Sequence, residues 1–439
     1  MTPADDERRV KRVPWGMVAM LGVGGALAIV ILVMVAHRAE SSTDFRDFWE
    51  NGVCFRQTGR IATDLGVHNY LPCFTILMTP WSWLPLPVAA VLFVLVSLGL
   101  FGVTVWLCAR PLCATVEARA RWAVPIAVGL MTPYVYACAV LGNLGLVLLF
   151  LVVLAWYWAA RGRPWVAGAA LGLATLLKVL PAVLIVFFLL KRQWRVAGGA
   201  VGTIVVVGLG LPLVLLGPGR TVAAHRAFYE EAVRHHAARE TILSEHPIKA
   251  KYNNNALPIV LRRLLSPVNG GTAEEPLRVN VAAWSGPGIL AVYLALLGAL
   301  GAMSLGALWR GAPVTELEAS GRQSVGADAQ FGVWCCLMLL ASPLVWTHYL
   351  PLVYWPLAVV VERVTAARKW CAAEWVGAAA LVVWLGGAIL LAWPAARAAG
   401  AQIGSVAVLW VAVMVLSVRK ESRAVATDDV GAAADVRSA

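Results

Sequence analysis

The sequence is dominated by long apolar runs that are separated by short segments rich in lysine and arginine. Runs such as 15–36, 86–109 and 196–217 contain no charged residue. Each has the ~20 residues that a helix needs to cross the hydrocarbon core of a bilayer. Because lipid offers the backbone no hydrogen-bond partners, such runs must be helical. The pattern therefore predicts an all-α polytopic membrane protein.

The same pattern predicts about twelve transmembrane helices. A single membrane-embedded domain would cover 1–418, and the tail 419–439 has no hydrophobic periodicity, so we expect it to be disordered. We expect the helices at about 15–37, 86–109, 122–141, 144–160, two short helices within 165–190, then 196–217, 284–309, 329–346, 349–362, 375–394 and 401–418.

The stretch 165–190 is interrupted once, at Lys178-Val179-Leu180-Pro181. Basic clusters flank it on both sides, which places both flanks in the cytoplasm. One spanning helix cannot return to the side where it began, whereas two short helices can. Pro181 disfavours a continuous helix at this point. We therefore expect a hairpin with Lys178 near its tip.

The distribution of Lys and Arg also predicts the orientation. Short loops that carry these residues lie in the cytoplasm, so both termini are expected there, in a plasma membrane. The basic start at 8–12 is also compatible with a signal peptide, but the apolar run that follows is too long for one. The two large polar segments, 38–85 and 218–283, then fall together on the extracytoplasmic side.

Composition supports this class and excludes others. Hydrophobic residues make up 60% of the 439 residues and charged residues 14%, against roughly a quarter charged in soluble domains. The net charge of +12 does not indicate nucleic acid binding, because the basic residues sit mostly in short loops. The eight cysteines show no metal-ligand spacing. Cys54 and Cys73 lie in one external segment. Their spacing is equally compatible with a disulfide and with two free thiols, because spacing alone does not fix the geometry.

Three ionisable residues stand where chemistry is expected. Asp44, just past a membrane helix, is placed to act as a general base, although a solvated Asp at a helix N-cap is the commoner meaning. Lys178 inside an apolar segment is costly and indicates a site for an anion such as phosphate. The alternative is a snorkelling Lys or an ion pair with Asp44 or Asp47. His348 is equally compatible with a structural role and with binding a hydroxyl or phosphate.

Several motifs in order along 40–360 resemble glycosyltransferase family 87, a membrane-embedded family of the GT-C class. Asparagines replace the family's glutamines in two of these motifs, and Leu71 and Ala256 also depart from its pattern. The motifs are Asp44-Phe45-Arg46-Asp47-Phe48-Trp49, Tyr70-Leu71-Pro72, Gly142-Asn143, Leu177-Lys178-Val179-Leu180-Pro181, Asn254-Asn255-Ala256-Leu257 with Arg262-Arg263, and Ser342-Pro343-Leu344-Val345-Trp346-Thr347-His348.

The resemblance implies a GT-C-type bundle that moves a hexose, expected to be mannose, from a polyprenyl-phosphate donor to a lipid-linked or cell-envelope glycan at the extracytoplasmic face. It implies Asp44 and His348 as catalytic residues and requires no cofactor or metal. A transporter or flippase for a lipid-linked or anionic substrate is the alternative, although it usually shows internal repeats. The implied substrate-binding residues are Lys178, Asp47, Tyr70, Asn143, Asn254, Arg262, Arg263 and Trp346.

Overall fold

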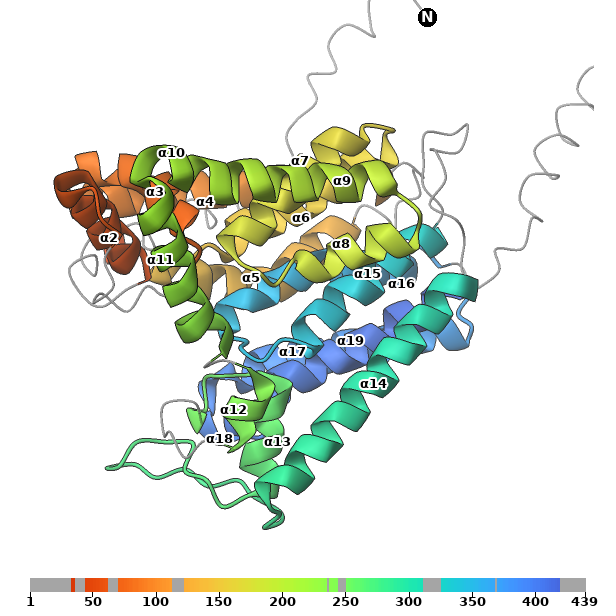
Figure 1. The fold of residues 1–439 in the computed structure, drawn as a ribbon. Coiled ribbons are helices and arrows are strands. Elements are labelled where there is room, and N and C mark those ends of the chain that lie inside the picture. Colours follow the sequence, from red (N-terminus) through yellow and green to blue (C-terminus); the bar gives the residue numbers. More distant parts are fainter. Residues whose placement is uncertain are drawn as a thin grey trace, which may run out of the picture.

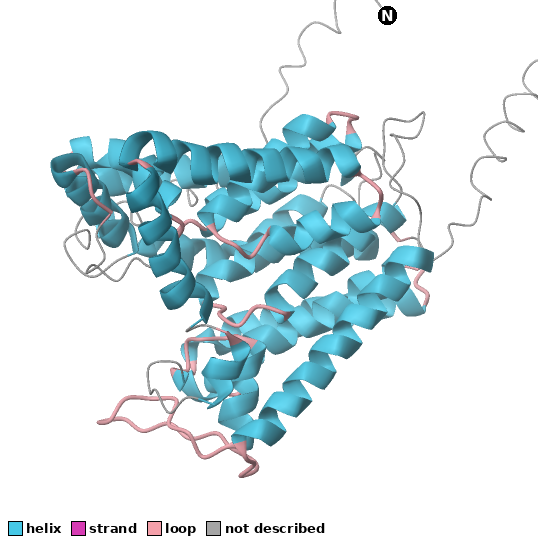
Figure 2. Cartoon of the chain, in the orientation of Figure 1, coloured by secondary structure: helices cyan, strands magenta, loops and turns pink. Residues whose placement is uncertain are grey.

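The computed structural model describes residues 33–35, 44–61, 70–112, 122–234, 237–243, 250–310, 325–367 and 369–418. Every regular element in this part of the chain is a helix (Figure 2), and its one β contact is an isolated bridge between Asn254 and Trp346. The all-α prediction is confirmed for these residues. Of the predicted first helix at 15–37, only 33–35 belong to the described residues. The tail 419–439 lies wholly outside the described residues.

Five helices are long and apolar enough to cross a membrane. Four shorter apolar helices pack among them, so the described residues agree with a helical membrane protein, and the total of twelve spans stays a prediction. The five are α4 (Leu86–Leu112), α5 (Ala123–Leu141), the continuous stretch Trp194–Leu216 formed by α9, η4 and α10, α14 (Gly286–Arg310), and α17 (Ala372–Ile389) with its extension to Ala392; the four are α6 (Gly145–Ala160), α7 (Pro164–Leu177), α15 (Val325–Leu340) and α19 (Ala401–Ser417).

The predicted break after 177 is present. Helix α7 ends at Leu177, Lys178 has an extended backbone, and α8 (Ala182–Leu190) begins after Pro181. Small residues hold this hairpin against its neighbour, because a Cβ at Gly168 or Gly172 would collide with the backbone of α9 (Trp194–Thr203). Close contact through small residues is the usual way in which membrane helices pack.

The predicted helix at 329–346 is too long. Helix α15 ends at Leu340, and residues 341–346 are irregular before the 3₁₀ helix η7 (Thr347–Val353) and α16 (Tyr354–Ala366). Pro343 explains the early end, since a proline disfavours helical backbone in the residue before it. The tip predicted at Trp346-Thr347-His348 is therefore preceded by an irregular segment at 341–346.

Several helices lie in the described parts of the two large polar segments, to which the sequence analysis assigned no elements. Figure 1 shows their helices gathered at one end of the bundle, which we call the α2 end. The first segment contains α2 (Asp44–Thr58), α3 (Pro72–Met78) and η2 (Thr79–Trp83); the second contains α11 (Pro218–Phe228), the π-helical η5 (Tyr229–Arg234), α12 (Ala238–Leu243) and α13 (Leu257–Leu265); and α18 (Pro394–Ala398) joins them from the last connection.

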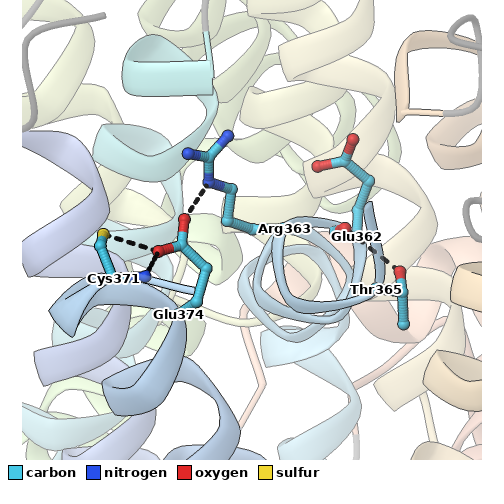
Figure 3. A network of polar contacts seen from close by, with 5 residues as sticks. All are labelled: Glu362, Arg363, Thr365, Cys371 and Glu374. Carbon is cyan, nitrogen blue, oxygen red and sulfur yellow. Dashed lines mark hydrogen bonds and ion pairs between the residues drawn. The ribbon is translucent and has the colours of Figure 1, made fainter. Parts of the chain in front are cut away.

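A polar network ties α16 to α17 at the end of α16 that is remote from η7. Arg363 donates to Glu374 at 3.0 Å, and the other carboxylate oxygen of Glu374 accepts from the backbone N–H and the thiol of Cys371 (Figure 3). Glu374 is 1% exposed, so the arginine supplies the partner that a buried carboxylate requires. Cys54 and Cys73 are both free thiols in the structure, which gives no support to a disulfide between them.

Cysteine labelling tests the predicted sidedness of the α2 end. We expect a membrane-impermeant maleimide to label Arg60→Cys and Thr272→Cys in intact cells, because both positions are exposed and lie in the two polar segments. The background would lack Cys54, Cys113 and Cys371. Lys369→Cys, in the connection between α16 and α17, should label only after permeabilisation. Labelling of either polar segment only after permeabilisation contradicts the topology.

Candidate active site

A cavity of about 1020 Å³ opens at the α2 end of the bundle. Its walls come from α2, α5, the break between α7 and α8, η5, the 341–349 segment and α18. Most of the residues that the sequence analysis selected face this one space, although they are up to three hundred residues apart in the chain. They are Asp44, Asp47, Tyr70, Asn143, Lys178, Trp346 and His348.

Asp44 stands in the first turn of α2, where the helix dipole favours a carboxylate. Its Oδ2 accepts a hydrogen bond of 2.5 Å from Nδ2 of Asn143. The orientation of the Asn143 amide is determined by its oxygen, because Oδ1 accepts the backbone N–H of Gly145 at 3.0 Å. Gly142 makes this approach possible: its φ is +60°, and a Cβ there would collide with Phe45.

His348 faces the same carboxylate from the start of η7. Its Nε2 lies 3.9 Å from Oδ2 of Asp44, which is longer than a hydrogen bond. The imidazole is held through its backbone, since the thiol of Cys138 donates to the His348 carbonyl at 3.1 Å. Gly145 lacks the Cβ that would block this carbonyl. A ligand hydroxyl that lies beside this pair can therefore hydrogen-bond to both Asp44 and His348.

Lys178 projects between two aromatic rings at the helix break. Its Nζ lies 4.1 Å from the ring centroid of Tyr349 and 5.1 Å from that of Tyr70. Within the described residues it forms no ion pair with a carboxylate. Aromatic faces stabilise a cation without consuming its hydrogen-bond donors. The ammonium can therefore still bind an anion that enters the cavity.

Burial and charge shape the acid–base properties of this group. Burial raises the pKa of Asp44 above its ordinary 3.8, while the Asn143 hydrogen bond and the Lys178 charge oppose that rise. Burial, followed by the nearby Lys178 charge, lowers the pKa of His348 well below its usual value. His348 is therefore a neutral imidazole at neutral pH. An aspartate with a raised pKa is a better proton acceptor than a solvated one.

Three predicted residues do not contact the cavity. Oδ1 of Asn254 accepts the backbone N–H groups of Ala256 at 3.1 Å and Val345 at 3.3 Å. Next to it, the Asn255 N–H donates to the Val345 carbonyl at 2.6 Å. Asn254 thus positions the segment that carries Trp346 and His348, and its contribution to the cavity is indirect.

Arg262 and Arg263 are the other two predicted residues that do not contact the cavity, and both are buried. Arg262 donates to the Thr241 carbonyl at 3.0 Å, and Arg263 donates to the carbonyls of Ala398 at 2.8 Å and Lys251 at 2.6 Å. The structure places neither guanidinium at the cavity. Basic residues that satisfy buried carbonyls and basic residues that bind a ligand look alike in a sequence.

Other cavity residues were missed by the sequence analysis, namely Tyr349, Thr347, Asn253 and Arg397. Arg397 carried a usable signal, because it stands alone in a short connection that the predicted topology places outside, where Lys and Arg are disfavoured. Among the described residues, no cluster of three or more His, Cys, Asp or Glu residues could hold a metal ion.

Comparison with known proteins decides the family. Residues 68–343 of the 439-residue chain match the model of glycosyltransferase family 87. The chain belongs to this family. The match includes Tyr70, Asn143 and Lys178, while Asp44 and His348 lie beyond its two ends. Membership of family 87 favours sugar transfer over the transporter alternative.

Two kinds of curated relative are similar to parts of the chain. A polyprenol-phosphate-mannose-dependent alpha-(1-2)-phosphatidylinositol mannoside mannosyltransferase of Mycobacterium tuberculosis is 27% identical over 47% of this chain and 53% of its own length. A protein of the same description from Mycolicibacterium smegmatis is 29% identical over 38% of this chain and 39% of its own length. An alpha-(1->3)-arabinofuranosyltransferase of M. tuberculosis is 35% identical over 33% of this chain and 34% of its own length. The chain spans about half the length of the first of these relatives and less than half the length of the other two. No solved structure matches it.

Substitution of Arg263 tests whether this residue is structural. We expect Arg263→Met to destabilise the folded protein by roughly 2–4 kcal/mol, because it leaves buried carbonyls without donors. Thermal unfolding in detergent would measure the loss, and Arg278→Met, at an exposed position of the same polar segment, is the matched control. Normal stability combined with loss of donor binding would show that Arg263 contacts substrate instead.

Proposed function

We propose that this protein transfers a sugar from a polyprenyl-phosphate donor to an acceptor hydroxyl at the extracytoplasmic membrane face. The observation that carries the proposal is the placement of the Asp44 carboxylate and the Lys178 ammonium on one cavity. A general base and a cation without a carboxylate partner are what attack by a hydroxyl and departure of a phosphate require. The α2 end of the bundle is then the outer side.

The reaction follows from these positions. Asp44 accepts the proton of the acceptor hydroxyl as the hydroxyl oxygen attacks the anomeric carbon of the donor sugar. The bond from that carbon to the phosphate oxygen breaks, and the polyprenyl phosphate leaves with the electron pair. Lys178 neutralises the charge that develops on the leaving phosphate. The neutral His348 hydrogen-bonds a hydroxyl of either sugar and so orients it next to Asp44.

The rest of the cavity suits a lipid substrate. Side chains of α5 and α8 form an apolar wall next to the polar group, among them Val140, Leu141, Ala182 and Val183. Such a wall can accept isoprenoid units of the donor while its phosphate reaches Lys178. The lipid chain would extend from there into the bilayer.

The sugar and the acceptor are inferred from the relatives. Two of them are described as using polyprenol-phosphate mannose, which supports mannose as the sugar here. The arabinofuranosyltransferase is a relative whose name gives a different sugar. We therefore propose mannose as the donor sugar and a lipid-linked or cell-envelope glycan as the acceptor.

Transfer in detergent micelles tests this function. Purified protein would receive radiolabelled polyprenyl-phosphate mannose and a mixture of phosphatidylinositol mannosides. We expect Asp44→Asn to lower kcat by roughly 10²–10⁴-fold, the usual contribution of a general base, while folding is preserved because the amide is nearly isosteric. Asp47→Asn, three residues along the same helix, should cost less than about tenfold. A larger loss in Asp47→Asn than in Asp44→Asn would refute the assignment of the base.

The pH dependence should report the pKa of Asp44. Because the base must be deprotonated, activity rises as pH increases through this pKa, which burial holds above 3.8. The Asn143 hydrogen bond opposes that rise, so Asn143→Leu should raise the pKa further and move the acidic limb of kcat/KM to higher pH. Asn143→Gln retains an amide and should move it less. An unchanged limb in Asn143→Leu would mean that another group titrates.

Lys178 should act on the donor. Lys178→Met keeps the length of the side chain and removes its charge, and we expect roughly 10²-fold lower activity with weaker donor binding. Stability should stay level or rise, since a costly charge has been removed from an apolar segment. Lys178→Arg should rescue only partly, because a planar guanidinium does not reproduce a compact ammonium.

The opposite pattern would give Lys178 a different role. A Lys178→Met protein that unfolds at lower temperature yet retains full activity per folded molecule would make this residue a structural cation.

A further inference from the structure

A second cation faces the cavity from the connection between α17 and α19. Arg397 lies with its guanidinium carbon 4.9 Å from the ring centroid of Tyr252, and one of its N–H groups reaches the Thr347 hydroxyl oxygen at 3.5 Å. Its buried Nε has no hydrogen-bond acceptor among the described residues. None of the carboxylates in that part of the chain forms an ion pair with it.

This arrangement differs from that of Arg263. Among the described residues, both arginines leave one buried donor without an acceptor, Nη2 in Arg263 and Nε in Arg397. Arg263 donates to three backbone carbonyls and does not line the cavity, whereas Arg397 lines it. A buried donor without a partner costs about 1–3 kcal/mol. A ligand that supplies an acceptor and a negative charge would remove that cost.

Two other residues of the cavity indicate what kind of ligand this is. Asn253 lines the cavity, and its buried Oδ1 accepts no hydrogen bond from the described residues. The Thr347 hydroxyl also lines the cavity. The guanidinium is suited to a phosphate, and the Asn253 carbonyl oxygen is suited to a hydroxyl next to it. Together these groups fit a phosphate attached to a polyol.

The position of Arg397 differs from that of Lys178. Lys178 is held by Tyr70 and Tyr349, whereas Arg397 is held by Tyr252 and Thr347. In the sequence, His348 stands between Thr347, which contacts Arg397, and Tyr349, which contacts Lys178. The cavity is therefore lined by two cations that have different partners.

We propose that Arg397, with Asn253 and Thr347, binds the phosphate of an anionic acceptor lipid, while Lys178 binds the phosphate of the donor. This assignment rests on the proposed function and adds to it the chemistry of the acceptor, a phosphate-bearing polyol headgroup. It makes Arg397 a determinant of acceptor binding that leaves the donor site unchanged.

Lipid binding by the full-length protein in detergent micelles tests the assignment. The probes are phosphatidylinositol, which has a phosphate and ring hydroxyls, decaprenyl phosphate, which has the donor's phosphate, and uncharged diacylglycerol. We expect Arg397→Met to raise the Kd for phosphatidylinositol roughly tenfold or more, as for loss of a charge-assisted hydrogen bond, and to leave that for decaprenyl phosphate within about twofold. Lys178→Met should show the reverse. Diacylglycerol binding should not change in either variant.

Two further variants keep the result interpretable. Arg278→Met removes the same charge from an exposed position outside the cavity and should change neither Kd. Arg397→Lys keeps a cation and should retain part of the phosphatidylinositol binding, so a poorly folded Arg397→Met protein would not decide the outcome alone.

The proposal is overturned if Arg397→Met weakens decaprenyl phosphate rather than phosphatidylinositol, because Arg397 would then belong to the donor site. It is also overturned if both Kd values are unchanged, because the guanidinium would then only pack on Tyr252. These measurements need no turnover, so they are independent of the Asp44→Asn assay, which tests the proposed function itself.

Discussion

The placement of ionised groups in a largely apolar bundle is the constraint on which the rest of this structure depends. A charge in such surroundings is costly unless specific partners stabilise it. Asp44 has the Asn143 amide and the first turn of α2, and Lys178 has the faces of Tyr70 and Tyr349. These partners stabilise each charge while leaving one side open to the cavity.

Helix breaks at one end of the bundle make this arrangement possible. Irregular backbone at membrane depth is tolerated where it lines a cavity or is buried in protein. Gly142 and Asn143 end α5, Lys178 follows the end of α7, and the 341–346 segment follows the end of α15. Each break contributes a polar side chain to the same space. The close approach of Gly145 to the His348 carbonyl brings two of these segments together.

Much of this could be predicted from the sequence, because lipid imposes simple rules. Uninterrupted apolar runs predicted the long helices to within a few residues, and Pro181 between basic flanks predicted the hairpin that exposes Lys178. Ionisable residues within or beside apolar runs pointed to Asp44, Lys178 and His348, since a charge there is costly. The early end of α15 was missed, although Pro343 explains it afterwards.

The polar end could not be predicted in the same way. Its short helices α11, α12 and α13 are stabilised by packing between segments far apart in the chain, such as the bond from Arg263 to Ala398. The local pattern around Arg262 and Arg263 does not reveal the tertiary contacts by which both guanidiniums donate to backbone carbonyls. Arg397 had one signal in the sequence, its place in a connection predicted to be external, but only the tertiary structure places it beside Thr347 and Tyr252.

Direct observation of a bound donor would test the central claim most directly, namely that Asp44 and Lys178 share one active site. The measurement is a cryo-electron microscopy structure of the Asp44→Asn protein in a nanodisc with polyprenyl-phosphate mannose, since this variant should bind the donor without turning it over. The account predicts density for the phosphate within hydrogen-bond distance of Lys178 and the anomeric carbon facing residue 44. A donor bound outside this cavity, or with its phosphate on Arg397 and its sugar away from residue 44, would contradict it.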